Sequence, residues 1–321
     1  MKKVVILALF AIITSVCIIV VIKNKEKCDF KNEQTSLTYD FSFAELAIKY
    51  LETGNSEYLQ EISNLDATTH LYNHALHCRT IKPTSSKLEL ITNLLSPIDK
   101  QKELLPIFKK RLDFAKEEIA KSGIAEKTAL QFLPADYNFS SSLFFTFGYN
   151  HAAYGESCNV NLADTTITMD FMIYLAAHEL HHTGFFALKG GYIPSLDITT
   201  YKEMLHEIEY CTHLEGMAVY AQLSTMEEEN PLNSDMPIPD LKELEEEYFD
   251  IYYHFKNALD SLLTQEDWNK FHRLSDGGLW YTMGAHMTKI IDKNLGREKL
   301  VSLISEPSEN FVATYLELKR Q

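Results

Sequence analysis

The 321-residue chain is poor in glycine and proline, with 12 and 9 residues respectively. Both residues interrupt helices and favour turns, so their scarcity argues against a turn-rich β architecture. Basic residues are also outnumbered, because 30 Lys and Arg stand against 45 Asp and Glu, which gives a formal net charge of −15. Since nucleic-acid binding needs a dense cationic face, this balance excludes nucleic acid as an expected partner.

Cysteine is scarce as well: the chain has five, and none stands in a Cys-x-x-Cys pair. This spacing does not indicate a structural zinc knuckle. Cys17 lies in an apolar run, and the remaining four, an even number, are Cys28, Cys78, Cys158 and Cys211. Two interpretations stay open for these four, namely two disulfides in an oxidising compartment or four small buried thiols.

One long apolar run, residues 4–22, stands near the amino terminus and is interrupted only by Thr14 and Ser15. As a helix it would be about 28 Å long, close to the thickness of a bilayer core. No Ala-x-Ala cleavage site ends the run. We therefore predict a single-pass membrane anchor with its juxtamembrane segment in residues 1–29, and an extracytoplasmic body. A cleaved signal peptide and a buried core helix are the alternatives.

The remaining pattern predicts an α+β fold that is mainly helical. Apolar residues recur every three or four positions through residues 43–122, which is typical of helices. Short apolar stretches punctuated by glycine then predict strands over 143–147 and 159–162, and a strand or turn over 165–168. A further helix is predicted from Asp170, its expected N-cap, and others over about 201–226, 239–263 and 279–294. Residues 230–240 carry three prolines and are predicted to form a surface loop. We expect a helical region over residues 30–130 and a catalytic region over residues 131–321.

The segment that indicates chemistry is His-Glu-Leu-His-His at residues 178–182. Positions four apart share one face of a helix, so His178 and His182 can each give one nitrogen to a Zn²⁺ ion. Glu179 stands about 100° from His178 around the helix. Its carboxylate can therefore take a proton from a metal-activated water that attacks a carbonyl. The alternative is that these histidines only pack in the core or on the surface. His181 is a weaker candidate for a metal ligand, because only the pair of His178 and His182 leaves Glu179 in position to act as the base.

A catalytic zinc ion needs a third protein ligand. The helix predicted over about residues 201–226 carries several candidates. We favour Glu215, because the small Gly216 and Ala218 after it permit this helix to approach the motif helix closely. His213 and Glu207 are the alternatives.

These segments resemble the gluzincin zinc metallopeptidases, on the motif at 178–182 followed by Glu-Gly-x-Ala at 215–218. Within that group the chain is most similar to bacterial zinc-dependent peptidases whose motif is written His-Glu-x-His-His. The segments Trp-Tyr-Thr-Met-Gly at 280–284 and Leu-Gly-Arg-Glu-Lys-Leu at 295–300 are also similar to that group. The similarity covers about residues 130–320, and the helical first third more weakly.

The resemblance implies a zincin-like (gluzincin) core, in which a small sheet lies over the active-site helix and other helices are added. It also implies one zinc ion held by His178, His182 and Glu215, with Glu179 as general base. The chain departs from the thermolysin-like pattern at Val219, where that pattern has an aspartate that orients a metal-bound histidine. The carboxylate for this role is therefore unassigned.

Two further sets of side chains are candidates for the site. Tyr281 is favoured as the donor to a developing oxyanion from its position in the resembling segment, with His286 as the alternative and simple packing as a third interpretation. His70, His74 and His77 fall on one face of a predicted helix. They can form a second metal site, line a substrate cleft, or be ordinary surface histidines.

The sequence therefore predicts a membrane-anchored zinc hydrolase, best interpreted as a metallopeptidase (a protease) that acts on a peptide or protein substrate. The hydrolytic chemistry follows from the ligand and base positions, whereas the peptide substrate follows from the resemblance. One alternative is a non-catalytic, membrane-anchored binding or scaffold protein that keeps a zincin-like frame. Another is a hydrolase of non-peptide amides or esters.

Overall fold

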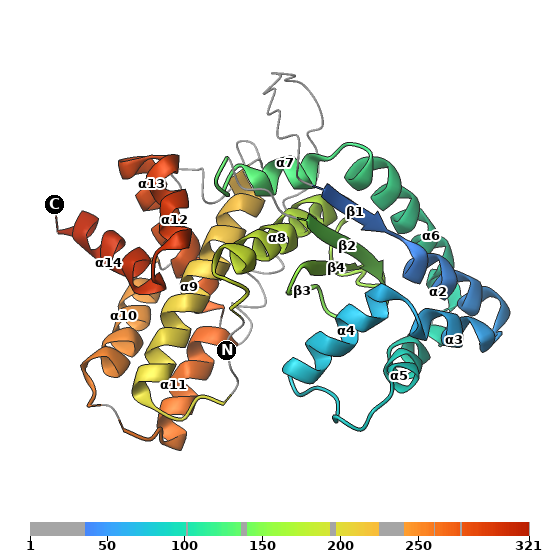
Figure 1. Ribbon diagram of the computed structural model, residues 1–321, viewed down its shortest axis with the longest axis horizontal. Coiled ribbons are helices and arrows are strands. Elements are labelled where there is room, and N and C mark those ends of the chain that lie inside the picture. Colours follow the sequence, from blue (N-terminus) through green and yellow to red (C-terminus); the bar gives the residue numbers. More distant parts are fainter. Residues whose placement is uncertain are drawn as a thin grey trace. The chain divides into compact units, whose positions relative to one another are not determined.

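The computed structural model describes residues 36–100, 102–135, 140–192, 197–224, 241–259, 261–276 and 278–320. This part of the chain is mainly helical, with one mixed sheet of four strands (Figure 1). It divides into two compact units. The first contains the described residues up to Lys127 together with Ala135–Thr183, and the second contains Thr128–Pro134 together with the described residues from Gly184 onward. The mainly helical α+β class is confirmed, whereas the gluzincin core and the predicted domain limits stay predictions.

The first unit combines the sheet with helices from the amino-terminal half. Its strands are β1 (Ser36–Asp40), β2 (Ser140–Thr146), β3 (Ala152–Tyr154) and β4 (Ser157–Asn161). Its helices are α2 (Ser42–Thr53), α3 (Glu57–Ser63), α4 (Asp66–His77), α5 (Lys87–Asp99), the short η1 (Lys102–Leu104), α6 (Leu105–Phe114) and the π-helix η2 (Ala115–Ala120). Two helices, α7 (Ile124–Leu130) and α8 (Met169–Leu188), have residues in both units.

The second unit is helical. It contains α9 (Tyr201–Ser224), α10 (Leu241–Asn257), α11 (Gln265–Ser275), α12 (Leu279–Leu295), α13 (Arg297–Ser302), the short η3 (Leu303–Ser305) and α14 (Ser308–Lys319). Within this unit α10, α11, α12 and α14 all contact α9, which is therefore its central element (Figure 1).

The sheet has the order β1-β2-β4-β3, with β1, β2 and β4 parallel and β3 antiparallel at one edge. Alternate residues of β2 face opposite sides of the sheet. Phe145 stacks on Phe41 just before α2, with ring centroids 4.5 Å apart, whereas Phe144 meets His70 of α4 at 5.7 Å. Helices therefore cover both faces, and the sheet is buried on each side.

Several predicted elements match the structure, and others differ from it. The strands predicted at 143–147 and 159–162 overlap β2 and β4, and α2 ends at Gly54, whose φ of 69° is the left-handed conformation that suits glycine. Residues 165–168 are a turn rather than a strand. Helix α10 ends at Asn257, several residues before the predicted limit. The predicted loop at residues 230–240 lies outside the described residues.

Arg111 of α6 forms hydrogen bonds to the loop that leads from the sheet into α8. Its buried guanidinium donates from Nε to the carbonyl of Leu162 at 2.8 Å, from Nη1 to that of Ile167 at 2.9 Å and from Nη2 to that of Asp164 at 2.7 Å. Three backbone acceptors of one short loop thus depend on a single side chain. The start of α8 is fixed to α6 by this contact.

Replacing Arg111 by methionine is expected to lower the free energy of unfolding by at least about 3 kcal/mol, because three carbonyls lose a charged donor. Chemical denaturation monitored by circular dichroism measures the change. The matched control is Lys109→Met on the same helix, since Lys109 makes only an exposed ion pair with Glu52, which is worth at most about 1 kcal/mol. Equal losses in the two variants would contradict the role assigned to Arg111.

The prediction of a single-pass membrane protein with an extracytoplasmic body must be corrected. Within the described part of the chain, no helix combines the length and the apolar composition that crossing a membrane demands. The long helices α8 and α9 both carry histidines and carboxylates, so they are too polar for that purpose. The segment predicted as the anchor, residues 4–22, lies outside the described residues.

The cysteines in the described residues carry free thiols. These are Cys158 and Cys211, which are buried, and Cys78, which is half-buried. The interpretation as small unpaired side chains therefore holds for these three, and Cys28 lies outside the described residues.

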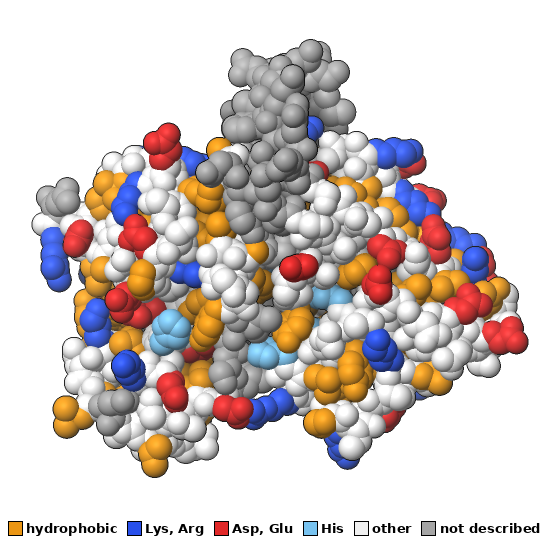
Figure 2. Space-filling model, viewed as in Figure 1, with side chains coloured by type: hydrophobic (Ala, Val, Ile, Leu, Met, Phe, Trp, Pro, Cys, Tyr) orange, Lys and Arg blue, Asp and Glu red, His pale blue; other side chains and the backbone are white. Residues whose placement is uncertain are grey.

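On the face drawn in Figure 2, charged side chains are dispersed rather than gathered. Figure 2 shows acidic and basic side chains interspersed across the visible face. Several form exposed pairs one helical turn apart, such as Lys270 with Glu266 on α11 at 2.8 Å. Such pairs add little to stability.

Candidate metal centre

Helix α8 presents the motif at 178–182 from a buried position. The helix begins at Met169, and the hydroxyl of Thr168 accepts from the backbone N–H of Phe171 at 3.2 Å, so Thr168 rather than the expected Asp170 caps it. His178, Glu179 and His182 are all at most 8% exposed. Polar groups buried to this degree need partners, and their presence in an apolar helix is a functional signal.

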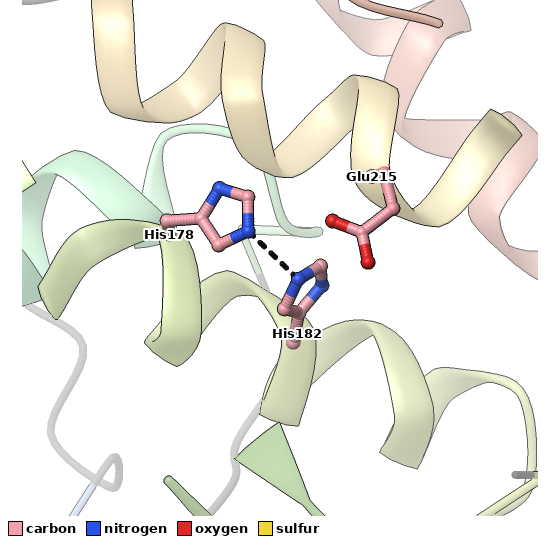
Figure 3. Close-up of side chains that lie close together, drawn as sticks. All are labelled: His178, His182 and Glu215. Carbon is pink, nitrogen blue, oxygen red and sulfur yellow. Dashed lines mark hydrogen bonds between the residues drawn. The ribbon is translucent and has the colours of Figure 1, made fainter. Parts of the chain in front are cut away.

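The two histidines face each other. Their Nε2 atoms lie 2.9 Å apart, and the rings are nearly perpendicular, with centroids at 4.5 Å (Figure 3). Two nitrogens that ligate one tetrahedral zinc ion at about 2.0–2.1 Å are separated by about 3.3 Å. The observed separation is within a few tenths of an ångström of that value, so small side-chain rotations fit the pair to a cation.

Glu215 of α9 completes the set. One ligand atom from each of His178, His182 and Glu215 lies within 4.8 Å of the others. Figure 3 shows the carboxylate directed toward the two imidazoles. Two imidazole nitrogens and one carboxylate oxygen are a donor set that suits Zn²⁺ in a site with an open position. Among the described residues, no other three His, Cys, Asp or Glu side chains meet in this way.

A glycine contact holds the part of α9 that carries Glu215. The backbones of α9 and α12 touch at Gly216 and Gly284, and a Cβ built on Gly216 would lie 2.3 Å from the carbonyl carbon of Gly284. A Cβ on Gly284 would lie 2.2 Å from the carbonyl oxygen of Thr212. Neither position accepts a side chain without displacing backbone. Gly216 does permit a close helix contact, but the partner is α12 and not the motif helix α8 for which the contact was predicted.

Glu179 lies near the sheet. Its negative charge contributes to the raised pKa of the Cys158 thiol on β4, for which burial is the larger cause. Cys158 pairs in register with Leu143 of β2. On the same helix, the hydroxyl of Thr183 accepts from Ser141 of β2 at 3.2 Å. These contacts place the base-bearing face of α8 beside β2 and β4.

The other candidates for ligands have different environments. His213 is fully buried, stacks on Phe311 at 4.4 Å, and contacts the hydroxyl of Ser308 through Nδ1 at 3.3 Å. Glu207 accepts a hydrogen bond from the Cys211 thiol at 3.2 Å. His181 is fully buried on α8. None of these three belongs to the three-residue cluster.

The position of Val219 is apolar in this structure. Val219 packs against Leu223 and Ala285. It supplies no carboxylate to a metal-bound histidine, so the role that the thermolysin-like pattern gives to an aspartate there is not filled from this position.

The two oxyanion candidates lie on different faces of α12. Tyr281 is in the first turn and is 36% exposed, with its ring 6.3 Å from that of Trp280. His286 packs against Tyr315 at 5.8 Å. Burial lowers the pKa of His286, and the charge of Glu245 opposes this shift. His286 therefore interacts with α14 and α10, and Tyr281 is the more accessible candidate.

The three histidines of α4 form a cluster of their own. His74 contacts the hydroxyl of Tyr149 through Nδ1 at 2.7 Å, and His77 meets the ring of Tyr154 at 5.5 Å. Burial lowers the pKa of His70 and of His74 to about 4, so both imidazoles are neutral at pH 7. The cluster packs against β3 and the turn before it, and it does not form a three-ligand group.

Some residues that position the site were not assigned from the sequence. The sequence pattern predicts no positioning role for Gly284 or for Arg111. A glycine inside an apolar helix is a signal for close helix packing. An arginine in an amphipathic helix carries no signal of its own, because most such residues are exposed.

Comparison with known proteins assigns the chain to a family. A family model described as "Putative zinc dependent peptidase (DUF5700)" matches residues 51–321. The match covers most of the chain, so the chain belongs to this family, and the predicted resemblance to zinc-dependent peptidases is confirmed. No curated protein and no solved structure matches the chain.

Proposed function

We propose that the protein is a zinc-dependent hydrolase, specifically a metallopeptidase that cleaves peptide bonds. The observation that carries this proposal is the convergence of His178, His182 and Glu215 beside a buried glutamate. The family supports a zinc-dependent peptidase in general terms. The ligand roles, the single ion and the mechanism are our proposal.

A zinc ion held by His178, His182 and Glu215 would supply Lewis acidity to the scissile carbonyl and to a water molecule. Glu179 takes a proton from the attacking water and then gives it to the departing amine nitrogen. Burial of Glu179 keeps bulk water away from this proton transfer. Tyr281 is proposed as the hydroxyl donor that stabilises negative charge on the carbonyl oxygen.

Two alternatives are distinguished by measurement. A non-catalytic binding protein would hold zinc and bind peptides without cleaving them. A hydrolase of non-peptide amides or esters would leave a broad peptide library intact but turn over small ester and amide reporters. The family assignment favours the peptidase over both.

Zinc content and its removal test the proposal. The purified chain is expected to contain about one zinc ion, and a strong chelator is expected to abolish cleavage of a peptide library and to lower the melting temperature. Added zinc restores both. His182→Ala should lose the zinc, whereas His272→Ala, which changes an exposed histidine of α11, should retain it. Zinc bound equally by wild type and His182→Ala would contradict the assigned ligand.

A further inference from the structure

Glu207 is a buried carboxylate that lies on α9 two helical turns before Glu215. It is 8% exposed. Its hydrogen-bond partner is the Cys211 thiol, which donates to Oε1 at 3.2 Å. Within the described residues Glu207 has no basic side chain in ion-pair contact. Burying a carboxylate without a cation is costly, so its retention in this position calls for a reason.

Glu209, on the same helix, has different surroundings from those of Glu207. Glu209 is also buried, but it accepts from the hydroxyl of Tyr252 at 2.9 Å, and that hydroxyl accepts in turn from Lys256 Nζ at 2.8 Å. The Glu209 carboxylate thus ends a chain that contains a cation. Glu207 accepts instead from the Cys211 thiol, which is a weak donor. Burial raises the pKa of Glu207 to about 7, and the hydrogen bond from Cys211 opposes this shift.

The ring of Tyr192 packs against the turn of α9 that carries Glu207. Burial is the larger cause of the raised pKa of Tyr192, and the negative charge of Glu207 adds to it. Tyr192 is 38% exposed, and its ring lies 5.6 Å from that of His206 and 4.9 Å from that of Tyr210. The Tyr210 hydroxyl donates to the backbone carbonyl of Tyr192 at 3.0 Å, which holds the backbone of Tyr192 against α9. A carboxylate beside an accessible aromatic face is the combination that binds ammonium and guanidinium groups.

We propose that Glu207 and Tyr192 form a substrate subsite for a cationic group, namely a lysine or arginine side chain or a peptide amino terminus. The inference rests on the proposed peptidase function, because it assigns part of the substrate to that site. Eight residues separate Glu207 from Glu215, a rise of about 12 Å along the helix. An extended peptide covers that distance in about three to four residues. The cation is therefore expected about three to four positions from the scissile bond.

Paired peptides test the subsite without relying on turnover. Alanine-based peptides, blocked at both ends, carry one lysine at each successive position, and in their twins norleucine replaces it. A further peptide has a free amino terminus and no lysine. Calorimetry measures binding to zinc-loaded Glu179→Gln protein. For one position of the lysine, the cationic peptide is expected to bind at least about tenfold more tightly than its norleucine twin. If the subsite binds an amino terminus instead, the peptide with the free amino terminus should show the same advantage over its blocked form.

Adding Glu207→Gln should reduce the ratio of the affinity for the cationic peptide to that for its neutral twin to about twofold or less. Adding Glu209→Gln, the matched buried control, should leave this ratio unchanged. Tyr192→Leu provides a second variant and should reduce the ratio by a smaller factor. Equal binding of all charged and neutral twins, or a ratio that survives Glu207→Gln in folded protein, would overturn the subsite.

The two proposals fail in different ways. If wild-type protein cleaves no peptide but binds the cationic twin in a Glu207-dependent manner, the peptidase assignment is wrong and the cation subsite stands. If it cleaves charged and neutral twins at equal rates, the peptidase assignment stands and the subsite is wrong.

Discussion

Glu179→Gln is expected to reduce kcat for peptide hydrolysis by at least about 10³-fold while the protein keeps its zinc ion. Proton transfer by a positioned side chain contributes about 10²–10⁴-fold to a rate. Glutamine preserves the shape and hydrogen-bonding reach of glutamate, but it cannot accept the proton of the attacking water. Because Glu179 is not one of the three clustered side chains, the metal affinity should change little. Metal analysis and single-turnover kinetics measure the two quantities.

The control for this prediction is Glu61→Gln, which makes the same change at an exposed position of α3 and should leave the rate unchanged. A Glu179→Gln protein that loses zinc would show that the carboxylate supports the metal rather than the proton transfer. A variant that retains both zinc and a wild-type rate would contradict the proposed mechanism altogether.

The motif residues were predictable because their arrangement is local. Once residues 178–182 are helical, the stacking of His178 over His182 follows from the helix period and needs no knowledge of the rest of the fold. Glu215 does cluster with the two histidines as predicted, but the argument for it was wrong in part, because the glycine after it contacts α12 and not the motif helix. The family match from residue 51 onward also includes most of the helical segment for which the resemblance was weaker.

Long-range contacts were not predictable from the same patterns. Strand β1 pairs with β2 across more than a hundred residues of chain, as in the register of Ser36 with Ser140. Strand β3 has only three residues, too few for a periodic signal. The loop acceptors of Arg111 are backbone carbonyls, which every residue possesses, so side-chain identity does not mark them. The length of the apolar run at residues 4–22 was likewise not enough to support the prediction of a single-pass membrane protein.

Gly216→Ala is expected to destabilise the protein by at least about 3 kcal/mol and to weaken zinc binding by at least about tenfold. Overpacking of a buried contact costs about 1–3 kcal/mol when side chains can adjust, and more when they cannot. The new Cβ would lie 2.3 Å from one backbone atom of Gly284 and 2.5 Å from another. Helix α9 would have to move away from α12, and Glu215 is the residue next to the clash.

The matched control is Gly184→Ala on α8. Its Cβ would lie 2.3 Å from Cδ1 of Leu133, the end of a flexible side chain that can rotate away. The nominal clash distance is the same in the two variants, but only Gly216→Ala meets backbone. Thermal denaturation of the metal-free proteins isolates the packing cost, and competition with a chelator measures zinc affinity. If both variants lose the same stability, the backbone contact between α9 and α12 is not what limits side-chain size at Gly216. If Gly216→Ala loses stability but binds zinc normally, the position of Glu215 does not depend on that contact.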